Sequence, residues 1–502
     1  MIPLDPVPHP IDHLPGRGAP GDIAIADRAG EMTYAELEHA VGSLAGWLAR
    51  QELKPGDRVA SWLPKTRMAC LMPLAAPRAG LVHVPINPLL KRAQVAHILA
   101  DSGAGLLLTQ PARAGTFEPG DVPTSCRQCV EDDVADADVM PPSDADPLAL
   151  VAILYTSGST GPPKGVMLSH ANLWLGAISV AHYLKVTPED RTLCVLPFSF
   201  DYGQNQLFST WAAGGGVVPL DYLTPRDVIK AVDRFGATTL AGVPPLWSQL
   251  LDADWPDAVA ARLKRLTNSG GALTVRMVRA LRARFPAADL YPMYGITEAF
   301  RSTYLDPSLV DAHPESMGKA IPFAEVMTVC ADGTRAAPGE AGELVHAGPL
   351  VSMGYWRDEA RTAERYRRAP PFFTSGGIAV FSGDQVIEGS DGLFRFVGRQ
   401  DEMIKSAGNR ISPTEVEEAV LAGGEATEAV AIGVPDERLG QVIVVVARAN
   451  GPTDVAEQVL RDRLRRDLPS FMQPARYDWR DTLPRNANGK LDRAALKAEV
   501  AS

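Results

Sequence analysis

The sequence predicts an α/β protein with a large N-terminal domain of layered α/β subdomains and a small C-terminal domain. Short apolar runs alternate with helical patterns up to the run ATTLAGVP. From about Ser316 to Phe396 the pattern changes to short strands separated by Gly, Asp and Pro turns, and it changes again near Gly398. We therefore expect an N-terminal domain over residues 1–398, which includes a small β-rich subdomain, and a mobile α+β domain over residues 399–502.

The segment MTYAELEHAVGSLAGWLARQEL predicts the first long helix. Thr33 stands at the N-cap position and Glu36 follows three residues later, which is the pattern of a capping box. Apolar residues then recur at helical spacing: Ala35, Leu37, Ala40, Val41, Leu44, Ala45 and Leu48. The run GDRVASWLP, an apolar helical stretch and the run GLVHVPINP come next, an order that favours parallel strands in an α/β layer.

Five further apolar runs continue the alternation and predict buried strands: AGLLLT, LALVAILYTS, RTLCVLPFS, GGGVVPL and ATTLAGVP. The later segment EVMTVCADGTRAAPGEAGELVHAG has the turn-rich pattern of the small β-rich subdomain. The segment GRQDEMIKSAGNRISPTEVEEAV then opens the α+β domain.

Composition and charge exclude several classes of protein. A chain of 502 residues is long enough for about three domains or subdomains. Its 49 Lys and Arg against 60 Asp and Glu give a net charge of −11, which argues against a general nucleic-acid or anionic-membrane binder. The N-terminus has no signal-peptide pattern and no apolar run reaches the length of a membrane span. We expect a soluble cytoplasmic protein.

The cysteines do not predict a structural role for disulfides or metal. The chain has five, an odd number spread over its length, which argues against a disulfide framework. Cys126 and Cys129 form one CxxC motif, but no second pair or histidine cluster follows at zinc-site spacing. We interpret them as two loop thiols.

A Gly- and Ser-rich loop follows the apolar run LALVAI and predicts a phosphate site. Glycines allow backbone N–H groups to approach an anion, hydroxyls add donors and Lys164 adds a compact positive charge. Because Pro163 precedes Lys164 and Gly165 follows it, the loop is not the Walker pattern. The loop residues are Thr156, Ser157, Gly158, Ser159, Thr160, Gly161 and Lys164. Their combination suits the polyphosphate of a nucleotide triphosphate.

The string TSGSTGPPKG resembles the phosphate-binding loop of the adenylate-forming superfamily, which includes acyl- and aryl-CoA synthetases, luciferases and adenylation domains of nonribosomal peptide synthetases. Other motifs of that superfamily follow in its order from about Met32 to Arg493: RAGLVHVPINP, SGGA, YPMYGITEA, GELVHAGPLVSMGYW, FSGD, GRQDEMIKSAGNRISPTEVE and PRNANGKLDR. The segments FSFDYGQNQLFSTWAAGGG and YGITEAFRSTYLDP also resemble bacterial AMP-forming acyl-CoA ligases of the exosortase A-associated type.

This resemblance implies a ligase that works in two steps. A carboxylate attacks the α-phosphorus of ATP and releases pyrophosphate, and a thiol then displaces AMP from the acyl adenylate. The implied cofactors are ATP, Mg²⁺ and CoA, or the phosphopantetheine of a carrier protein in place of CoA. The implied partners are a small carboxylic acid and either CoA or a separate carrier protein, and both a monomer and a homodimer fit the sequence.

The resemblance also implies the residues of the nucleotide site. The phosphate loop would cradle the β- and γ-phosphates, Glu298 would be the Mg²⁺ ligand, and Thr297 would donate to the α-phosphate. Lys490 would bridge the substrate carboxylate and the α-phosphate. The adenine and ribose would be held by Gly270, Gly271, Ala272, Tyr294, Gly295, Asp384, Arg399 and Arg410. The segment GGIAVFSGD around Asp384 departs from the GWxxTGD that is commoner in the superfamily.

In the C-terminal domain the resemblance implies a hinge at Asp401 that absorbs a backbone rotation between the two half-reactions. Lys405 and Arg410 flank Gly408, in a loop that would lie by the channel of the thiol substrate.

The acyl group is the open question. By analogy the substrate pocket would be formed by Asp201, Tyr202, Gln204, Gly242, Val243, Pro244, Ser269 and Ile296. Asp201 has two interpretations: a ligand for an amino or hydroxyl group of the substrate, as in amino-acid-activating domains, or a structural partner of neighbouring groups.

Four functions therefore remain in view. The first is an acyl-CoA ligase, and the alternative is a stand-alone amino-acid-adenylating enzyme that loads a carrier protein. A luciferase-like second step has no support in the sequence. A non-catalytic binding protein is disfavoured because Lys164, Glu298, Asp384 and Lys490 are all present.

Overall fold

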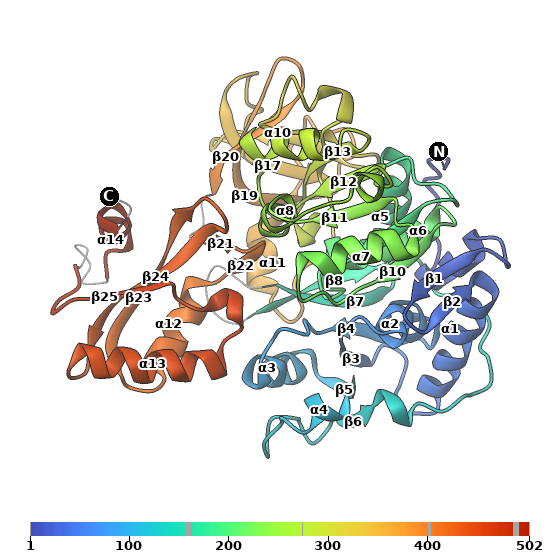
Figure 1. Cartoon of the computed structure of the whole chain (residues 1–502), viewed down its shortest axis with the longest axis horizontal. Helices are drawn as coiled ribbons and strands as arrows, with labels where there is room; N and C mark the ends of the chain where they lie inside the picture. Colours follow the sequence, from blue (N-terminus) through green and yellow to red (C-terminus); the bar gives the residue numbers. More distant parts are fainter. Residues whose placement is uncertain (1, 157–162, 274, 400–402, 485–490, 501–502) are drawn as a thin grey trace.

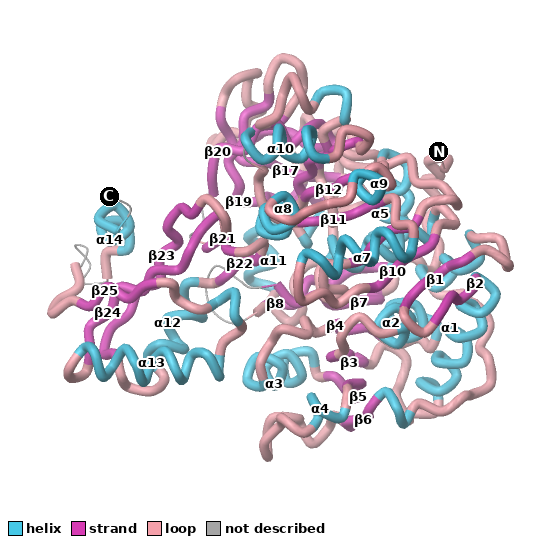
Figure 2. Tube along the Cα trace, viewed as in Figure 1, coloured by secondary structure: helices cyan, strands magenta, loops and turns pink. Residues whose placement is uncertain are grey.

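A computed structural model describes residues 2–156, 163–273, 275–399, 403–484 and 491–500 (Figure 1). It has the predicted mixed α/β architecture, with a large N-terminal domain and a small C-terminal domain. Figure 2 shows helices and strands interleaved through the N-terminal domain. The boundary between residues 398 and 399 stays a prediction, since the expected hinge residue Asp401 lies outside the described residues.

A six-stranded sheet carries the beginning of the N-terminal domain, in the order β6-β5-β3-β4-β7-β8. Its strands are β3 (Arg58–Trp62), β4 (Val82–Pro85), β5 (Ala104–Thr109), β6 (Arg127–Val130), β7 (Leu150–Thr156) and β8 (Lys164–Ser169). The pairs are parallel, as the alternating pattern predicts, except for the antiparallel pair β7 and β8. That last pair sets Thr156 opposite Lys164, so the two ends of the expected phosphate loop lie side by side.

A second, 14-stranded sheet combines a parallel and an antiparallel half, in the order β16-β17-β19-β20-β15-β14-β13-β12-β11-β9-β10-β1-β2, with β18 paired to β19. The parallel half contains β1 (Ile23–Asp27), β9 (Arg191–Cys194), β10 (Gly216–Pro219), β11 (Thr239–Gly242), β12 (Arg265–Asn268) and β13 (Asp289–Tyr294), and β2 (Gly30–Thr33) adds antiparallel to β1.

The antiparallel half is the β-rich region that the turn pattern predicts. Its strands are β14 (Thr303–Tyr304), β15 (Ser316–Ala320), β16 (Glu325–Val329), β17 (Ala341–Ala347), β18 (Tyr366–Arg368), β19 (Ile378–Glu388) and β20 (Phe394–Arg399). The strands β14 and β15 join this half to β13 by hydrogen bonds, so the region continues the large sheet. Antiparallel neighbours need no crossover helix, and residues 389–393 alone connect β19 to β20, which explains why the helical patterns thin out here.

Eleven α-helices lie in the described N-terminal domain: α1 (Tyr34–Ala49), α2 (Arg67–Arg78), α3 (Arg92–Ser102), α4 (Pro111–Ala114), α5 (His170–Tyr183), α6 (Asp201–Ala212), α7 (Pro225–Phe235), α8 (Pro244–Leu251), α9 (Asp257–Ala260), α10 (Val275–Arg284) and α11 (Glu359–Arg365). Short 3₁₀ turns are η1 (Ile11–Arg17), η2 (Glu131–Asp133), η3 (Thr297–Ala299) and η4 (Pro307–Leu309). The predicted cap of α1 is confirmed, because Glu36 N donates to Thr33 Oγ1 at 3.2 Å and Thr33 N donates to Glu36 Oε2 at 2.7 Å.

The C-terminal domain is a separate α+β unit with its own core. Its elements are β21 (Ile404–Ser406), β22 (Asn409–Ile411), α12 (Pro413–Leu421), β23 (Ala426–Asp436), β24 (Gly440–Ala449), α13 (Thr453–Asp467), η5 (Ser470–Met472), β25 (Arg476–Trp479) and α14 (Arg493–Val500). Strands run in the order β22-β21-β24-β23, with β25 parallel to β24. Val445 and Leu460 are among its fully buried residues.

Contacts between side chains join the two domains. Gln94 Nε2 donates to Glu415 Oε1 at 3.0 Å and approaches Met472 Sδ at 3.7 Å. The turn between β21 and β22 packs against Val243 of the large domain. The orientation of the small domain therefore brings its β21–β22 hairpin to the carboxyl edge of the large sheet.

Three sequence expectations about special features can be compared with this fold. The five cysteines are free thiols, and Cys129 lies in strand β6 rather than in a loop, because β5 offers β6 a parallel partner. No helix among the described residues is long and apolar enough to cross a membrane. In the same part of the chain, no group of three or more His, Cys, Asp or Glu is arranged to hold a metal ion.

Candidate active site

The carboxyl ends of three neighbouring parallel strands gather many of the residues expected in the site. Such an edge is where open α/β sheets bind ligands. Strand β11 ends at Gly242, β12 is followed by Ser269, and β13 ends at Tyr294. The further expected residues on this edge are Val243, Pro244, Gly270, Gly271, Ala272, Gly295 and Ile296.

The Gly270–Gly271 segment is held in a fixed shape by side chains below it. Asn268 Nδ2 donates to the carbonyl of Gly271 at 2.9 Å, and Trp247 Nε1 donates to Asn268 Oδ1 at 3.2 Å. Gly270 has φ of +80°, a conformation that favours glycine, and a Cβ at Gly271 would approach Pro244 to 3.1 Å. The segment therefore needs small residues.

The side chains of Tyr294 and Asp384 contact each other. From the sequence we expect them to bind adenine and ribose. The Tyr294 hydroxyl donates to Asp384 Oδ2 at 2.5 Å, and Asp384 is 3% exposed. The atypical segment around Asp384 forms strand β19, in which Gly383 has φ of +71°. Asp384 pairs with Arg399 of β20 in the backbone register, while the side chain of Arg399 lies outside the described part.

A connected polar cluster is formed by Lys164 at the start of β8, Glu298 in η3 and Tyr355. Lys164 Nζ donates to the Tyr355 hydroxyl at 2.8 Å, and that hydroxyl donates to Glu298 Oε1 at 2.7 Å. Lys164 Nζ also lies 3.4 Å from Glu298 Oε1 as an ion pair. The backbone N–H of Ser352 donates to the carbonyl of Glu298 at 2.9 Å and fixes the η3 turn. The cluster was not predicted as a unit, because Tyr355 belongs to the distant GYW segment.

The charges of this cluster shift the pKa values of both ionisable groups. Burial alone raises the pKa of Glu298, but Lys164, Arg410 and the Tyr355 hydrogen bond outweigh it and lower the pKa to about 2. Burial lowers the pKa of Lys164 to about 8, although Glu298 opposes that shift. Glu298 is therefore an ionised carboxylate with hard oxygen atoms at neutral pH, and Lys164 is a cation that loses its proton readily.

The phosphate loop itself begins at a buried hydroxyl. Thr156 Oγ1 is buried without a hydrogen-bond partner among the described residues. A buried hydroxyl normally has a partner, so this atom suits an anion that arrives with a ligand. The loop residues Ser157, Gly158, Ser159, Thr160 and Gly161 lie outside the described residues, as do Asp401 and Lys490.

Asp201 and Thr297 contact each other at the start of helix α6. Thr297 Oγ1 donates to Asp201 Oδ1 at 3.2 Å. Burial raises the pKa of Asp201, while the charge of Arg301 and the Thr297 bond oppose the rise. Thr297 is thus a structural partner of Asp201 as well as the expected phosphate donor, and both interpretations of Asp201 stay open.

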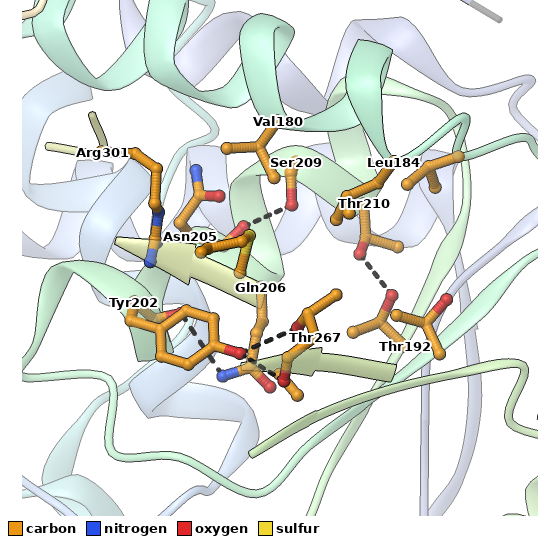
Figure 3. Close-up of a pocket in the computed structure, with 14 residues that line it drawn as sticks. Val180, Leu184, Thr192, Tyr202, Asn205, Gln206, Ser209, Thr210, Thr267 and Arg301 are labelled. Carbon is orange, nitrogen blue, oxygen red and sulfur yellow. Dashed lines mark hydrogen bonds between the residues drawn. The ribbon is translucent and has the colours of Figure 1, made fainter. Parts of the chain in front are cut away.

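A small cavity lies behind Tyr202, between α5, α6 and the sheet (Figure 3). The Tyr202 hydroxyl donates to the carbonyl of Thr267 at 2.7 Å. Among the expected pocket residues Tyr202 lines this cavity, whereas the cavity residues Asn205, Gln206 and Arg301 were missed. The sequence does contain a signal for the residues on α6. Polar side chains recur there at helical spacing and form one stripe of a buried helix: Tyr202, Asn205, Gln206 and Ser209. Gln204, which was expected, is 1% exposed on α6.

The β21–β22 hairpin brings the expected thiol-channel residues to this edge. Its two turn residues, Ala407 and Gly408, have φ of +52° and +76°, as a tight two-residue hairpin requires. Lys405 Nζ lies 4.3 Å from the centroid of the Phe396 ring. Arg410 is near enough to lower the pKa values of both Glu298 and Lys164.

Comparison with known proteins agrees with this geometry. Residues 15–356 match the family model of the AMP-binding enzyme, and residues 415–490 match the AMP-binding enzyme C-terminal domain. The chain belongs to the AMP-binding enzyme family. It is therefore an adenylate-forming ligase, as the sequence predicts.

Relatives in the AMP-binding family include both a CoA synthase and a ligase that acts with a carrier protein. The chain is 34% identical over 496 residues to the feruloyl-CoA synthase of Amycolatopsis sp, covering 96% of each chain. It is 30% identical over 499 residues to the L-proline–[L-prolyl-carrier protein] ligase of Pseudomonas fluorescens, covering 96% of this chain and 97% of the other. Over 487 residues it is also 31% identical to a much longer polypeptide of the linear gramicidin synthase of Brevibacillus parabrevis, of which it spans 9%.

Among solved structures, the o-succinylbenzoate CoA synthetase of Bacillus subtilis is similar in two states. With a CoA product analogue bound, a double mutant of that enzyme matches with a TM-score of 0.87 at 26% identity, covering 98% of this chain and 99% of the other. In complex with its acyl-adenylate, the enzyme matches with a TM-score of 0.72 at 26% identity, covering 98% of each chain. The arrangement of the two domains here is thus closer to the first state.

Proposed function

We propose that this AMP-binding enzyme activates a small carboxylic acid with ATP, releases pyrophosphate and transfers the acyl group from AMP to the thiol of CoA. The observation that carries the proposal is the cluster of Lys164, Tyr355 and Glu298 near the Thr156 hydroxyl, which has no partner among the described residues. The cluster joins a cation, a hydroxyl donor and an ionised carboxylate at the end of the expected phosphate loop. That set suits the polyphosphate of ATP together with a hard divalent cation.

In the first step an anionic carboxylate must approach an anionic phosphate, so fixed cations and donors have to lower the repulsion. Lys164 would hold the β- and γ-phosphates together with Thr156, Ser157 and Thr160, and Lys490 would bridge the two reacting groups. Glu298, already ionised, would hold Mg²⁺, which supplies positive charge against the phosphates. The Tyr355 hydroxyl orients both Lys164 and Glu298, since it bonds to each.

The nucleoside would lie along the carboxyl edge of the large sheet. The slot at Gly270, Gly271 and Ala272 would take adenine against the Tyr294 ring, with Gly295 behind it. Asp384 is buried and accepts a hydrogen bond from Tyr294, which supports a role for its carboxylate as the acceptor for two neighbouring ribose hydroxyls. Arg399 would reach the ribose from the adjoining strand.

The second step would use the domain arrangement described above. The turn at Gly408 packs on Val243, beside the predicted acyl pocket, and Lys405 and Arg410 flank that turn. This position supports a role for the hairpin in thiol transfer, with a rotation at Asp401 between the arrangement for adenylation and this one. The domains would then be residues 1–398 and 399–502.

A second candidate function rests on Asp201. The half-buried carboxylate of Asp201, at the start of α6, could pair with the α-ammonium group of an amino acid, and a relative of this chain is a prolyl-carrier protein ligase. In that case the acceptor thiol would belong to the phosphopantetheine of a separate carrier protein.

Pyrophosphate release with ATP and Mg²⁺ tests both candidates. The purified protein is offered fatty, aryl and amino acids, each with and without CoA. Release that depends on a non-amino acid and accelerates with CoA supports the acyl-CoA ligase. Release that depends on an amino acid, ignores CoA and is lost in Asp201→Ala supports the carrier-loading enzyme. If no acid causes pyrophosphate release, both candidate functions are contradicted.

A further inference from the structure

Arg301 places a guanidinium group inside the cavity behind Tyr202. The residue is 1% exposed, and its Cζ lies 4.6 Å from the centroid of the Tyr202 ring. Its Nε has no hydrogen-bond partner among the described residues. Figure 3 shows the guanidinium pointing into the space between Asn205 and Tyr202.

Other buried arginines of this protein pair with carboxylates. Arg78 donates to Asp12 Oδ2 at 3.2 Å and to Glu38 Oε1 at 2.7 Å. Arg265 donates to the carbonyl of Leu184 at 2.5 Å and forms an ion pair with Asp190 at 2.8 Å. Within the described part of the chain, Arg301 forms no ion pair of 4.0 Å or less. The charge of Arg301 does act on Asp201, since it opposes the rise in the pKa of that carboxyl group, but the two side chains form no ion pair within this distance. A buried guanidinium without a contacting counter-charge is costly, so it is retained where something else contacts it.

The backbone around Arg301 is built to hold it there. Phe300, directly before it, is 1% exposed and has φ of +58°, a conformation that is unfavourable for a bulky residue. A Cβ at Gly295 would come within 3.0 Å of Arg301 Cα and 3.3 Å of its Cδ, so only glycine leaves room for the arginine stem. Strain of this kind persists where a side chain has to be aimed at a particular place.

The guanidinium shares the cavity with further polar groups, in walls that also contain apolar residues such as Val180 and Met293. Asn205 Nδ2, Gln206 Oε1 and Thr239 Oγ1 are buried without hydrogen-bond partners in the part of the chain that the structure describes. All three residues line the same cavity. A straight alkyl chain would leave these groups and the arginine unsatisfied, whereas a group with charged acceptor oxygens would satisfy the guanidinium and the Asn205 amide together.

We propose that Arg301 and Asn205 bind a second carboxylate of the substrate, so that the acid activated by this enzyme is a dicarboxylic acid. This inference rests on the proposed function, because the reacting carboxylate must be the one that ATP activates. Asp201 directly precedes Tyr202 on α6 and contacts Thr297, the expected donor to the α-phosphate, so the reacting end would lie toward Thr297 and the second carboxylate would reach Arg301.

The test is acid-dependent ATP–pyrophosphate exchange with matched pairs of acids. Succinate, glutarate and adipate are each compared with the branched monoacid of the same shape: 4-methylpentanoate, 5-methylhexanoate and 6-methylheptanoate. In each monoacid an isopropyl group replaces the second carboxylate. We expect the wild-type protein to prefer at least one dicarboxylate over its partner by about a hundredfold in kcat/KM, the scale for leaving a buried charge unpaired. Preference for every monoacid overturns the inference.

Two variants and a control separate recognition from folding. Arg301→Met should lower kcat/KM for the preferred dicarboxylate by about a hundredfold, mainly through KM, and should leave or improve activity with its monoacid partner. Arg301→Lys should recover part of the loss because it restores the charge. Arg282→Met removes an arginine that pairs with Asp311 at the surface, and it should change neither activity.

The possible failures are distinguishable. If Arg301→Met loses both acids equally while ATP binding and thermal unfolding are unchanged, Arg301 is not specific for a carboxylate and the inference is wrong. If monoacids drive exchange and Arg301→Met is neutral, the proposed function stands and the inference fails, with water solvating the arginine instead. If no acid, including the fatty, aryl and amino acids, drives exchange, the proposed function fails first.

Discussion

Replacing Gly408 by alanine tests whether the observed domain arrangement serves the second half-reaction. A Cβ at this position would lie 2.9 Å from both Cβ and Cγ2 of Val243 and 3.1 Å from its Cγ1. Carbon atoms cannot approach so closely, and the Val243 atoms belong to a branched side chain with little freedom. The turn would have to move away from the large domain.

The magnitude follows from two separate costs. Gly408 has φ of +76°, and an alanine in this conformation costs about 1 to 2 kcal/mol. That cost belongs to the turn itself, so it destabilises the protein in any domain arrangement. Overpacking against Val243 costs about 1 to 3 kcal/mol and applies only while the hairpin is docked. The docked arrangement should therefore become about fivefold to a hundredfold less populated.

The assay measures the two half-reactions separately. ATP–pyrophosphate exchange follows adenylation, and CoA-dependent release of AMP from the presynthesised acyl adenylate follows transfer. We expect Gly408→Ala to slow transfer by about fivefold to a hundredfold and to leave exchange nearly unchanged. Val243→Ala in the same protein removes two of the three crowding atoms and should restore part of the transfer rate.

Gly424→Ala is the matched control. Gly424 also lies in the C-terminal domain with φ of +78°, but a Cβ there meets nothing within 4 Å. Its alanine should lower the melting temperature without separating the half-reactions. Equal losses of exchange and transfer in Gly408→Ala, or no loss in either, would refute the reasoning that docking at Val243 serves transfer.

Three further predictions concern two lysines of the site and the tyrosine that bonds to its charged groups. Lys490→Ala should slow adenylation by about 2.7 to 4 kcal/mol while transfer from a presynthesised adenylate survives, and equal loss of both in a stopped-flow comparison would contradict its assignment. Lys164 has a pKa of about 8, and bound phosphates would raise that pKa. ATP binding should therefore take up a proton and weaken as the pH rises through about 8. A KM for ATP that stays flat from about pH 7 to about pH 9, or the same pH profile in Lys164→Met, would contradict this prediction. Tyr355→Phe removes hydrogen bonds to two charged groups and should cost about 1.5 to 3 kcal/mol in kcat/KM for ATP, and an unchanged value in steady-state kinetics would exclude an orienting role.

Most of the fold could be read from the sequence because local patterns and the global fold agree. The helix that begins at Thr33 has its cap, its acidic third residue and its apolar face in the right positions, and it forms as predicted. The extent of the large sheet could not be read in the same way. The two-residue strand Thr303–Tyr304 joins the parallel and antiparallel halves, and a pattern of two residues carries no periodicity.

The residues of the site also divide into those that the sequence could predict and those that it could not. Lys164, Glu298 and Asp384 could be predicted because each belongs to a short motif in which neighbouring residues shape one loop. Arg301 could not, although it stands only three residues after Glu298, since what makes it unusual is the lack of an ion pair of 4.0 Å or less with any of the described residues that fold around it. Sequence patterns indicate which groups are near in the chain, whereas an unpaired charge is defined by everything that packs against it. For that reason the activation of an acid by ATP could be predicted from the sequence, whereas the choice of acid depends on Arg301 in its three-dimensional surroundings.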